Sequence, residues 1–209
     1  LANGADPQDG DVLVVNGLSS LTATYLADGT AGASDNDGTI TIVGQNAITF
    51  TTLEPASDLI GFGTVNINLP NANDVVNIAD ALDAGTNLLP VLAISGTSGG
   101  VTFEAINVRN TTNLVISTVT GGTDGNDTVT INSGTGPHGV TNLSLATGTG
   151  TDVVTVSGAL TVTGDISISS QQIAVNATLT TGATNTATLN AGTGAITTSG
   201  TGVDIVAQL

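Results

Sequence analysis

Residues 121–131 read GGTDGNDTVTI and contain both elements on which the fold of this chain depends. The first part, from Gly121 to Asp127, consists of Gly, Asp, Asn and Thr, which are typical of tight turns. The second part, from Asp127 to Ile131, alternates Thr with Val and Ile, as a strand with one buried face does. Similar short segments, each closed by Gly, Asn or Asp, recur along most of the chain. The sequence therefore predicts an all-β protein.

The junction between turn and strand is repeated, with Gly or Asn shortly before an Asp and an aliphatic residue after it. Several intervals between these Asp residues are close to 26 residues or to twice that number, and a period of this length indicates stacked units. A unit of about 26 residues accommodates three short strands and three turns. We therefore predict a right-handed parallel β-helix (a solenoid) with about 26 residues per coil; a β-sandwich is the alternative, although it normally has more aromatic core residues. The motif residues are Asp11, Asp37, Asp74, Asp127, Asp152 and Asp204, with an insertion between the second and the third.

The domain organisation predicted from this pattern is a single segment over residues 1–209. Residues 1–100 are less regular than residues 101–209. The pattern from Asp74 to Leu89 also fits a helix, with Gly85 as its stop signal. We expect the chain to be a fragment of a longer protein, because it begins without Met and ends abruptly at Leu209.

Composition and charge exclude several classes of function. The chain has 17 acidic residues, a single Lys or Arg and one His, which gives a net charge of −16. Nucleic-acid binding needs a basic surface, and an anionic membrane surface would repel such a chain. No apolar run approaches the ~18 residues of a membrane-spanning helix. There is no Cys for a disulfide or a thiolate metal site. With 39% hydrophobic residues, the chain still has enough apolar side chains to form a core.

The candidate metal ligands are Asp124, Asn126 and Asp127, which place three oxygen donors in one glycine-rich turn. Oxygen donors on a flexible loop are the ligands that Ca²⁺ uses, although the ion takes about six to eight of them. The alternative is that these side chains cap the turn by bonding nearby backbone amides. The same two interpretations apply to the acidic residues near Asp9 and Asp37.

The stretch from Gly121 to Val129 resembles the glycine- and aspartate-rich nonapeptide of RTX (haemolysin-type) calcium-binding proteins. Gly148 to Val154 and Gly200 to Val206 are similar. More broadly, the repeated Asp-x-Val-Thr units resemble very large bacterial surface and adhesin-like proteins with parallel β-helix repeats. RTX motifs follow one another every nine residues, whereas these lie about 26 apart. The resemblance therefore implies a β-helix with one or two calcium sites at most.

A polysaccharide-active β-helix enzyme is a further alternative, since such enzymes place carboxylates or Ca²⁺ beside a basic residue. The basic candidates are His138, which we expect to be exposed in a turn, and Arg109, which we expect to pair with a carboxylate such as Glu104. The chain has no Trp to form a sugar-binding platform. We therefore predict that it is not an enzyme.

The remaining prediction is a non-enzymatic structural or adhesive segment of a secreted cell-surface or extracellular-matrix protein. A calcium-binding surface-layer module is the alternative. The expected partners are neighbouring repeats of the parent chain, and another cell surface or an extracellular polysaccharide. Ice binding is less favoured, because the Thr-x-Thr pairs that an ice-binding face requires are irregularly spaced. Asn110, Asn142 and Asn176 fit the Asn-x-Ser/Thr glycosylation pattern.

Overall fold

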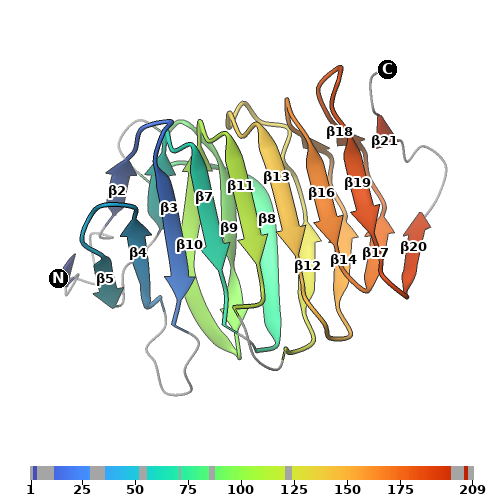
Figure 1. The fold of residues 1–209 in the computed structure, drawn as a ribbon, viewed down its shortest axis with the longest axis horizontal. Helices are drawn as coiled ribbons and strands as arrows, with labels where there is room; N and C mark the ends of the chain where they lie inside the picture. The colour runs from blue at the N-terminus through green and yellow to red at the C-terminus, as the bar shows by residue number, and fades with distance from the viewer. Residues whose placement is uncertain are drawn as a thin grey trace.

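The computed structural model describes residues 2–3, 12–28, 36–51, 56–70, 72–84, 88–120, 124–198 and 205–206. These residues form strands β1 to β21 and no helix, so the protein is all-β. Accordingly, no described segment is a helix that could cross a membrane. Figure 1 shows two layers of strands; the strands run across the long axis of the molecule and are stacked side by side along it.

Sheet A is the nine-stranded sheet nearer to the viewer in Figure 1. Its members, in spatial order, are β1 (Ala2–Asn3), β5 (Ile48–Thr51), β4 (Gly38–Ile42), β3 (Thr22–Ala27), β7 (Thr64–Asn68), β11 (Asn113–Ser117), β13 (Asn142–Ala146), β16 (Ile166–Ser169) and β19 (Ala187–Asn190).

Sheet B is the second nine-stranded sheet, and it lies behind sheet A in the same view. Its members, in spatial order, are β2 (Leu13–Asn16), β6 (Ser57–Ile60), β10 (Val101–Arg109), β9 (Pro90–Ser98), β8 (Asp74–Leu82), β12 (Thr128–Ile131), β14 (Val153–Val156), β17 (Gln172–Val175) and β20 (Ala195–Thr198). A small sheet C contains β15 (Leu160–Thr161), β18 (Leu179–Thr180) and β21 (Ile205–Val206).

The chain alternates between the two large sheets, and most neighbouring strands are parallel. From β11 to β20 every pair within a sheet is parallel. Antiparallel pairs occur only in the first half of the described chain, where β3, β4 and β5 form one meander and β8, β9 and β10 form another. Parallel strands align equivalent residues of successive passes, so a sequence pattern with this period becomes a column of neighbouring side chains.

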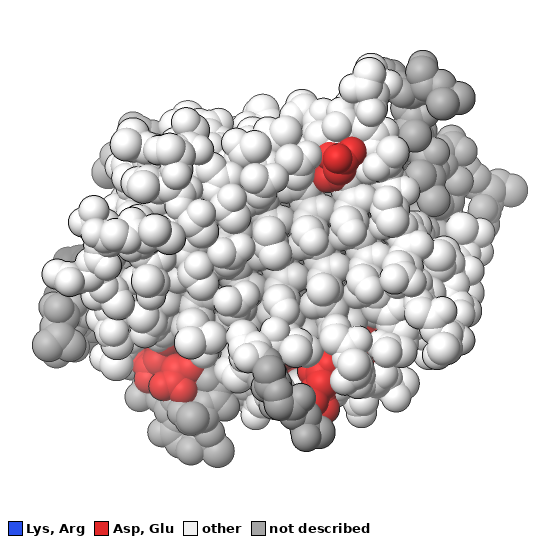
Figure 2. Space-filling model, in the orientation of Figure 1, with Lys and Arg blue, Asp and Glu red and all other residues white. Residues whose placement is uncertain are grey.

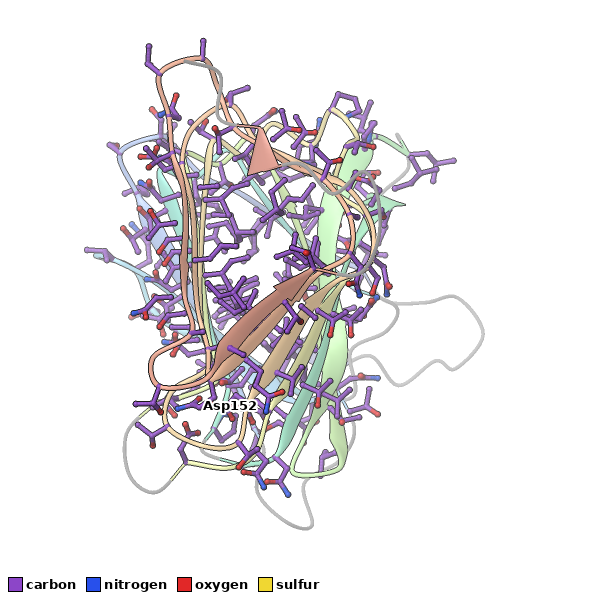
Figure 3. All side chains as sticks on the ribbon, turned by 90° about the vertical axis from the view of Figure 1, so that its right-hand side faces the viewer. Asp152 is labelled. Carbon is purple, nitrogen blue, oxygen red and sulfur yellow. The ribbon has the colours of Figure 1, made fainter. Side chains whose placement is uncertain are left out.

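The core lies between the two sheets, and the side chains in Figure 3 fill this space. Aliphatic residues alternate with polar ones along each strand, and successive side chains of a strand point to opposite faces. One buried column of sheet B contains Val76, Val129, Val154 and Ile173. A matching column of sheet A contains Ile67, Ile116, Leu145 and Ile168.

The helix predicted for residues 74–89 is wrong. Residues 74–82 form strand β8, which pairs with β9 on one side and with β12 on the other. The first part of this segment fits a strand, because the buried Asp74, Val76 and Ile78 alternate with more exposed neighbours. The sequence fitted the helical period of 3.6 residues nearly as well as the strand period of 2. Pairing with β9 and β12 stabilises the strand.

Candidate metal centre

Three aspartates stand in one column at the corner where the chain enters sheet B. Asp74 opens β8, Asp127 directly precedes β12, and Asp152 directly precedes β14. The register pairs the residue after each aspartate with the corresponding residue of the next strand. All three side chains are buried. We call this column, Asp74, Asp127 and Asp152, the aspartate ladder; Asp152 is labelled in Figure 3.

Backbone amides link the members of the aspartate ladder. The amide of Asp74 donates to Oδ1 of Asp127 at 2.9 Å, and the amide of Asp127 donates to Oδ1 of Asp152 at 3.0 Å. The carboxylates of Asp127 and Asp152 therefore each satisfy an amide of the preceding ladder member that would otherwise be buried without a partner. Because Asp74 and Asp127 are direct neighbours, their separation of 53 positions in the sequence corresponds to one pass with an insertion rather than to two repeats.

Hydroxyl groups from the end of sheet A bind the other oxygen of two ladder members. Thr118 donates to Oδ2 of Asp127, and Thr147 donates to Oδ2 of Asp152 at 3.2 Å. Each of these bonds closes the turn that leads from a strand of sheet A to a strand of sheet B. Asp152 also accepts the amide of Gly150 at 3.1 Å. These contacts are those of a turn-capping carboxylate.

Asp74 lacks the corresponding bonds. Leu69 follows β7 at the position that Thr118 and Thr147 occupy after β11 and β13, so no hydroxyl reaches Asp74 from that side. Its neighbour on the other side is Ser98 of the antiparallel strand β9. Neither carboxylate oxygen of Asp74 has a hydrogen bond of good geometry. Burial therefore raises the pKa of Asp74 from 3.8 to about 7; Ser98 opposes this shift, and the charges of Asp127 and Asp124 add to it.

Glycine at the second position before the aspartate has a steric cause. A Cβ on Gly150 would lie 1.8 Å from the carbonyl oxygen of Gly125, and a Cβ on Gly125 would lie 1.9 Å from the carbonyl oxygen of Ala72. Backbones of successive turns thus approach too closely for any side chain. The Gly-x-Asp spacing follows from this corner and does not require a bound ion.

Asp124, Asp127 and Asp152 form a group that could hold a metal ion, with one oxygen from each lying within 4.8 Å of the others. Burial raises the pKa of Asp127 and Asp152, while their hydrogen bonds lower it in part. The charge of Asp124 raises both pKa values further. Carboxylate oxygens fit a hard cation, and an oxygen that accepts one hydrogen bond keeps a second lone pair.

The structure places the predicted ligands in two different environments. Asp124 and Asp127 lie together, with Asp152 from the next pass as the third member. The side chain of Asn126 is exposed, and its Oδ1 accepts the amide of Thr151 at 2.8 Å. Sequence reasoning did not include Asp152 as a ligand, although its place in the same motif 25 residues after Asp127 was a usable signal.

The two basic residues lie elsewhere; the exposure expected for His138 was wrong, whereas Arg109 pairs with a carboxylate as expected, although not with Glu104. His138 is buried rather than exposed, with Nδ1 accepting the amide of Val140 at 3.1 Å and Nε2 at 3.3 Å from the carbonyl of Gly134. Arg109 pairs with Asp83 at 3.7 Å, whereas Glu104 is buried and accepts a hydrogen bond from Ser57.

A Gly-x-Ser-x-Gly pattern occurs at residues 96–100, but its structural context is a hairpin between β9 and β10. In hydrolases this pattern forms a turn between a strand and a helix. Ser98 is buried and faces Asp74 across the sheet. This hairpin therefore lacks the geometry of a nucleophile elbow.

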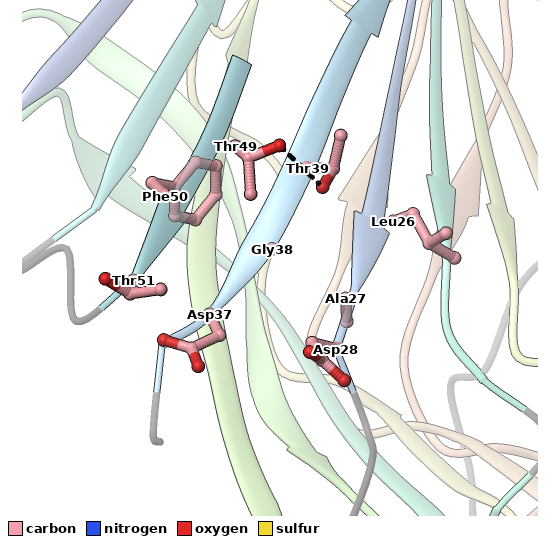
Figure 4. A pocket seen from close by; sticks show the side chains of 9 residues that line it. All are labelled: Leu26, Ala27, Asp28, Asp37, Gly38, Thr39, Thr49, Phe50 and Thr51. Carbon is pink, nitrogen blue, oxygen red and sulfur yellow. Dashed lines mark hydrogen bonds between the residues drawn. The ribbon is translucent and has the colours of Figure 1, made fainter. Parts of the chain in front are cut away.

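A pocket near the first meander of sheet A lies between β3, β4 and β5 (Figure 4). Asp28 and Asp37 lie at one end of the pocket. The hydroxyl oxygens of Thr39 and Thr49, on adjacent strands, are 3.5 Å apart. Phe50 forms part of its apolar wall. The lining residues include two carboxylates and no basic group.

Comparisons with protein-family models, with curated proteins and with solved structures found no match to this chain.

Proposed function

We propose that this chain is a segment of a right-handed parallel β-helix that serves as a non-enzymatic structural or adhesive part of a secreted cell-surface or extracellular-matrix protein. The observation that carries the proposal is the parallel, in-register stacking of β11 to β20, with continuous aliphatic columns inside and the aspartate ladder at one corner. Such an architecture transmits load along a row of interstrand hydrogen bonds.

Parallel pairing supports a β-helix over a β-sandwich, because sandwich sheets are antiparallel. Sheet C supports it as well, since β15 and β18 lie between a strand of sheet B and the next strand of sheet A in the chain. A pass of this kind therefore contains three short strands. From β11 to β20, paired residues of successive passes are 19 to 29 residues apart, a range that includes the expected 26.

The distribution of charge supports a surface role. On the face shown in Figure 2, acidic side chains occur as a few separate patches toward the margins, and the central part over sheet A is free of Lys, Arg, Asp and Glu. Outward positions there carry small polar residues such as Asn66, Ser144 and Ser167. A neutral face with hydroxyl and amide groups suits contact with an extracellular polysaccharide, while the acidic turns keep the protein soluble.

The test of this function is surface accessibility on intact cells of the organism that produces the chain. Antibodies against the folded chain are applied to intact and to lysed cells, and the purified chain is applied to immobilised polysaccharides. We expect labelling of intact cells that mild external proteolysis removes. Labelling restricted to lysed cells would contradict the proposal.

A calcium-binding surface-layer module is the second candidate, and the group Asp124, Asp127 and Asp152 is the observation that favours it. A ligand that binds only the folded state raises stability by ~2.7 kcal/mol at a hundredfold excess over its dissociation constant. Thermal unfolding followed by circular dichroism, with Ca²⁺ and then with a chelator, tests the site. An upward shift that Asp124→Asn abolishes and Asp165→Asn retains supports it; equal unfolding temperatures in Ca²⁺ and chelator reject it.

A further inference from the structure

The outer face of sheet A carries a row of uncharged polar side chains where four neighbouring strands begin. Thr22 of β3 is aligned with Thr64 of β7, and the alignment continues through Asn113 of β11 to Asn142 of β13. The next residue of each strand is buried, so these four side chains point away from the core. We call them the polar row. In the following pass Asp165 stands beside Asn142, so the uncharged row ends there.

Hydrogen bonds between side chains hold the amide groups of the polar row in place. Nδ2 of Asn142 donates to Oδ1 of Asn113 at 2.9 Å, and Nδ2 of Asn113 donates to Oγ1 of Thr64 at 3.4 Å. The hydroxyl of Thr64 accepts this bond and keeps its own hydrogen for a ligand. Groups that are already fixed lose little conformational entropy when a ligand binds.

A groove of about 160 Å³ lies at the Thr22 end of the polar row, between the turn that precedes β3 and the starts of β7 and β11. Backbone bonds fix its walls: the amide of Gly63 donates to the carbonyl of Leu21 at 3.0 Å, and the carbonyl of Gly63 accepts the amide of Asn113 at 3.0 Å. A Cβ on Gly63 would lie 2.2 Å from the carbonyl oxygen of Ser19, so only glycine permits this close approach. The polar side chains that line the groove are those of Ser19, Ser20, Thr22, Thr64, Thr112 and Asn113.

The lining of the groove defines the chemical class of its ligand. None of the described residues that line it is ionisable, so a charged ligand would meet no opposite charge. The net charge of −16 also repels an acidic polymer. Among the lining residues only Leu21 has a large apolar side chain, which leaves little contact for an apolar ligand. Hydroxyl and amide groups both donate and accept hydrogen bonds, as the hydroxyl groups of a sugar do.

The groove and the polar row form one continuous surface. Thr22, Thr64 and Asn113 belong to both, and the row extends from them to Asn142. Its length across the four strands is about 14 Å, because three spacings of about 4.8 Å separate them. An extended ligand can therefore lie across the strands with one part in the groove and another along the row.

We propose that the groove and the polar row bind an uncharged polysaccharide chain that crosses the starts of β3, β7, β11 and β13. The inference rests on the proposed adhesive function, and it specifies the class of polysaccharide and the place of contact. Hydrogen bonds from the fixed hydroxyl and amide groups supply the affinity, and the absence of charge from the lining selects against acidic polysaccharides.

Affinity electrophoresis of the 209-residue chain tests this site, because a net charge of −16 makes the protein migrate readily in native gels. The gels contain a neutral polymer of glucose, mannose, galactose or N-acetylglucosamine, or the acidic polymer alginate. We expect at least one neutral polymer to slow the protein in proportion to its concentration, and alginate to leave the migration unchanged.

Three variants locate the contact. Thr64→Val removes one hydroxyl of the groove and should weaken binding about threefold to tenfold. Thr112→Leu places a larger apolar side chain at an exposed position of the groove and should abolish binding. Thr155→Val is the matched control, because Thr155 is an outward-facing threonine of sheet B with the same partial burial as Thr64. Circular dichroism spectra confirm that each variant is folded.

Migration that no neutral polymer slows would overturn the inference, as would binding that Thr64→Val and Thr112→Leu both leave unchanged. Slowing by alginate alone would also contradict it. Labelling of intact cells by the antibodies described above does not depend on this site. A chain that is accessible on intact cells but binds no neutral polymer would therefore retain the proposed surface role and lose only this inference.

Discussion

The first half of the chain and the second half build the same two sheets by different means. Residues 13–109 include both antiparallel meanders and all four aromatic side chains, namely Tyr25, Phe50, Phe62 and Phe103. Between residues 113 and 198 every strand pair in the described part is parallel, and the sequence has no Phe, Tyr or Trp. Where the passes are uniform, aliphatic columns fill the interior; where strands are inserted, larger side chains fill the space.

The buried polar groups follow the same division. In the second half they occur in repeated, bonded sets such as Thr147 with Asp152. In the first half they include single contacts, such as Asn107 with Asp58 at 2.9 Å. Regular stacking thus repeats the same bonded pair in successive passes, as Thr118 with Asp127 and Thr147 with Asp152 show, whereas an insertion interrupts the repetition.

The largest expected effect comes from the aromatic part of the core. Phe50 is buried and stacks on Tyr25 with ring centroids 6.2 Å apart. Phe50→Ala should lower the free energy of unfolding by about 3–5 kcal/mol, and Ile168→Val in the regular half by about 0.5–1.5 kcal/mol. Chemical denaturation measures both. A loss for Phe50→Ala no larger than that for Ile168→Val would contradict the role of the aromatic pair in filling the first half of the core.

The second-largest loss of stability is expected where successive turns of the aspartate ladder approach each other closely. Gly150→Ala would bring a methyl group against the carbonyl oxygen of Gly125, and we expect a loss of about 1–3 kcal/mol. Thr151→Ala changes the exposed neighbouring residue and should have little effect. The melting temperatures of the two variants provide the comparison. A tolerated Gly150→Ala would show that glycine at this position has another cause.

Asp74 should make stability depend on pH in an unusual direction. Its pKa is about 7 in the folded protein and 3.8 ordinarily, so between these values the folded state holds a proton that the unfolded state releases. The free energy of unfolding therefore falls as pH rises from about 4 to about 7. We expect Asp74→Asn to remove part of this slope and to stabilise the protein at pH 8 by about 1–3 kcal/mol. Thermal unfolding at several pH values measures the slope, and an unchanged slope in Asp74→Asn would refute this account.

The smallest effect concerns one hydroxyl of the ladder. Thr147→Val removes the donor to Asp152 and should cost about 1 kcal/mol. Thr155→Val changes an outward-facing threonine of β14 and is the matched control. If both variants unfold alike, the hydroxyl does not stabilise the corner.

The all-β class could be predicted because short alternating segments and turn residues are recognised from the local sequence alone, without knowledge of tertiary contacts. The sequence also predicted that Asp124 and Asp127 share one turn. It did not distinguish an insertion from two repeats between Asp74 and Asp127, because the β9–β10 hairpin also consists of aliphatic-rich segments joined by Gly residues. Asp152 lies 25 residues after Asp127 and reaches the candidate site because β14 pairs with β12. This contact joins two passes, so the sequence of one turn does not reveal it.

Parallel stacking is the central claim, and cysteine cross-linking tests it most directly because the chain has no native Cys. In a parallel pair, Asn113 lies beside Asn142 and Ser117 beside Ala146. We predict rapid cross-linking, by a short thiol-specific reagent, of Asn113→Cys with Asn142→Cys and of Ser117→Cys with Ala146→Cys. The exchanged pairs, Asn113→Cys with Ala146→Cys and Ser117→Cys with Asn142→Cys, should remain unlinked. Preferential linking of the exchanged pairs would indicate antiparallel strands and would contradict the account.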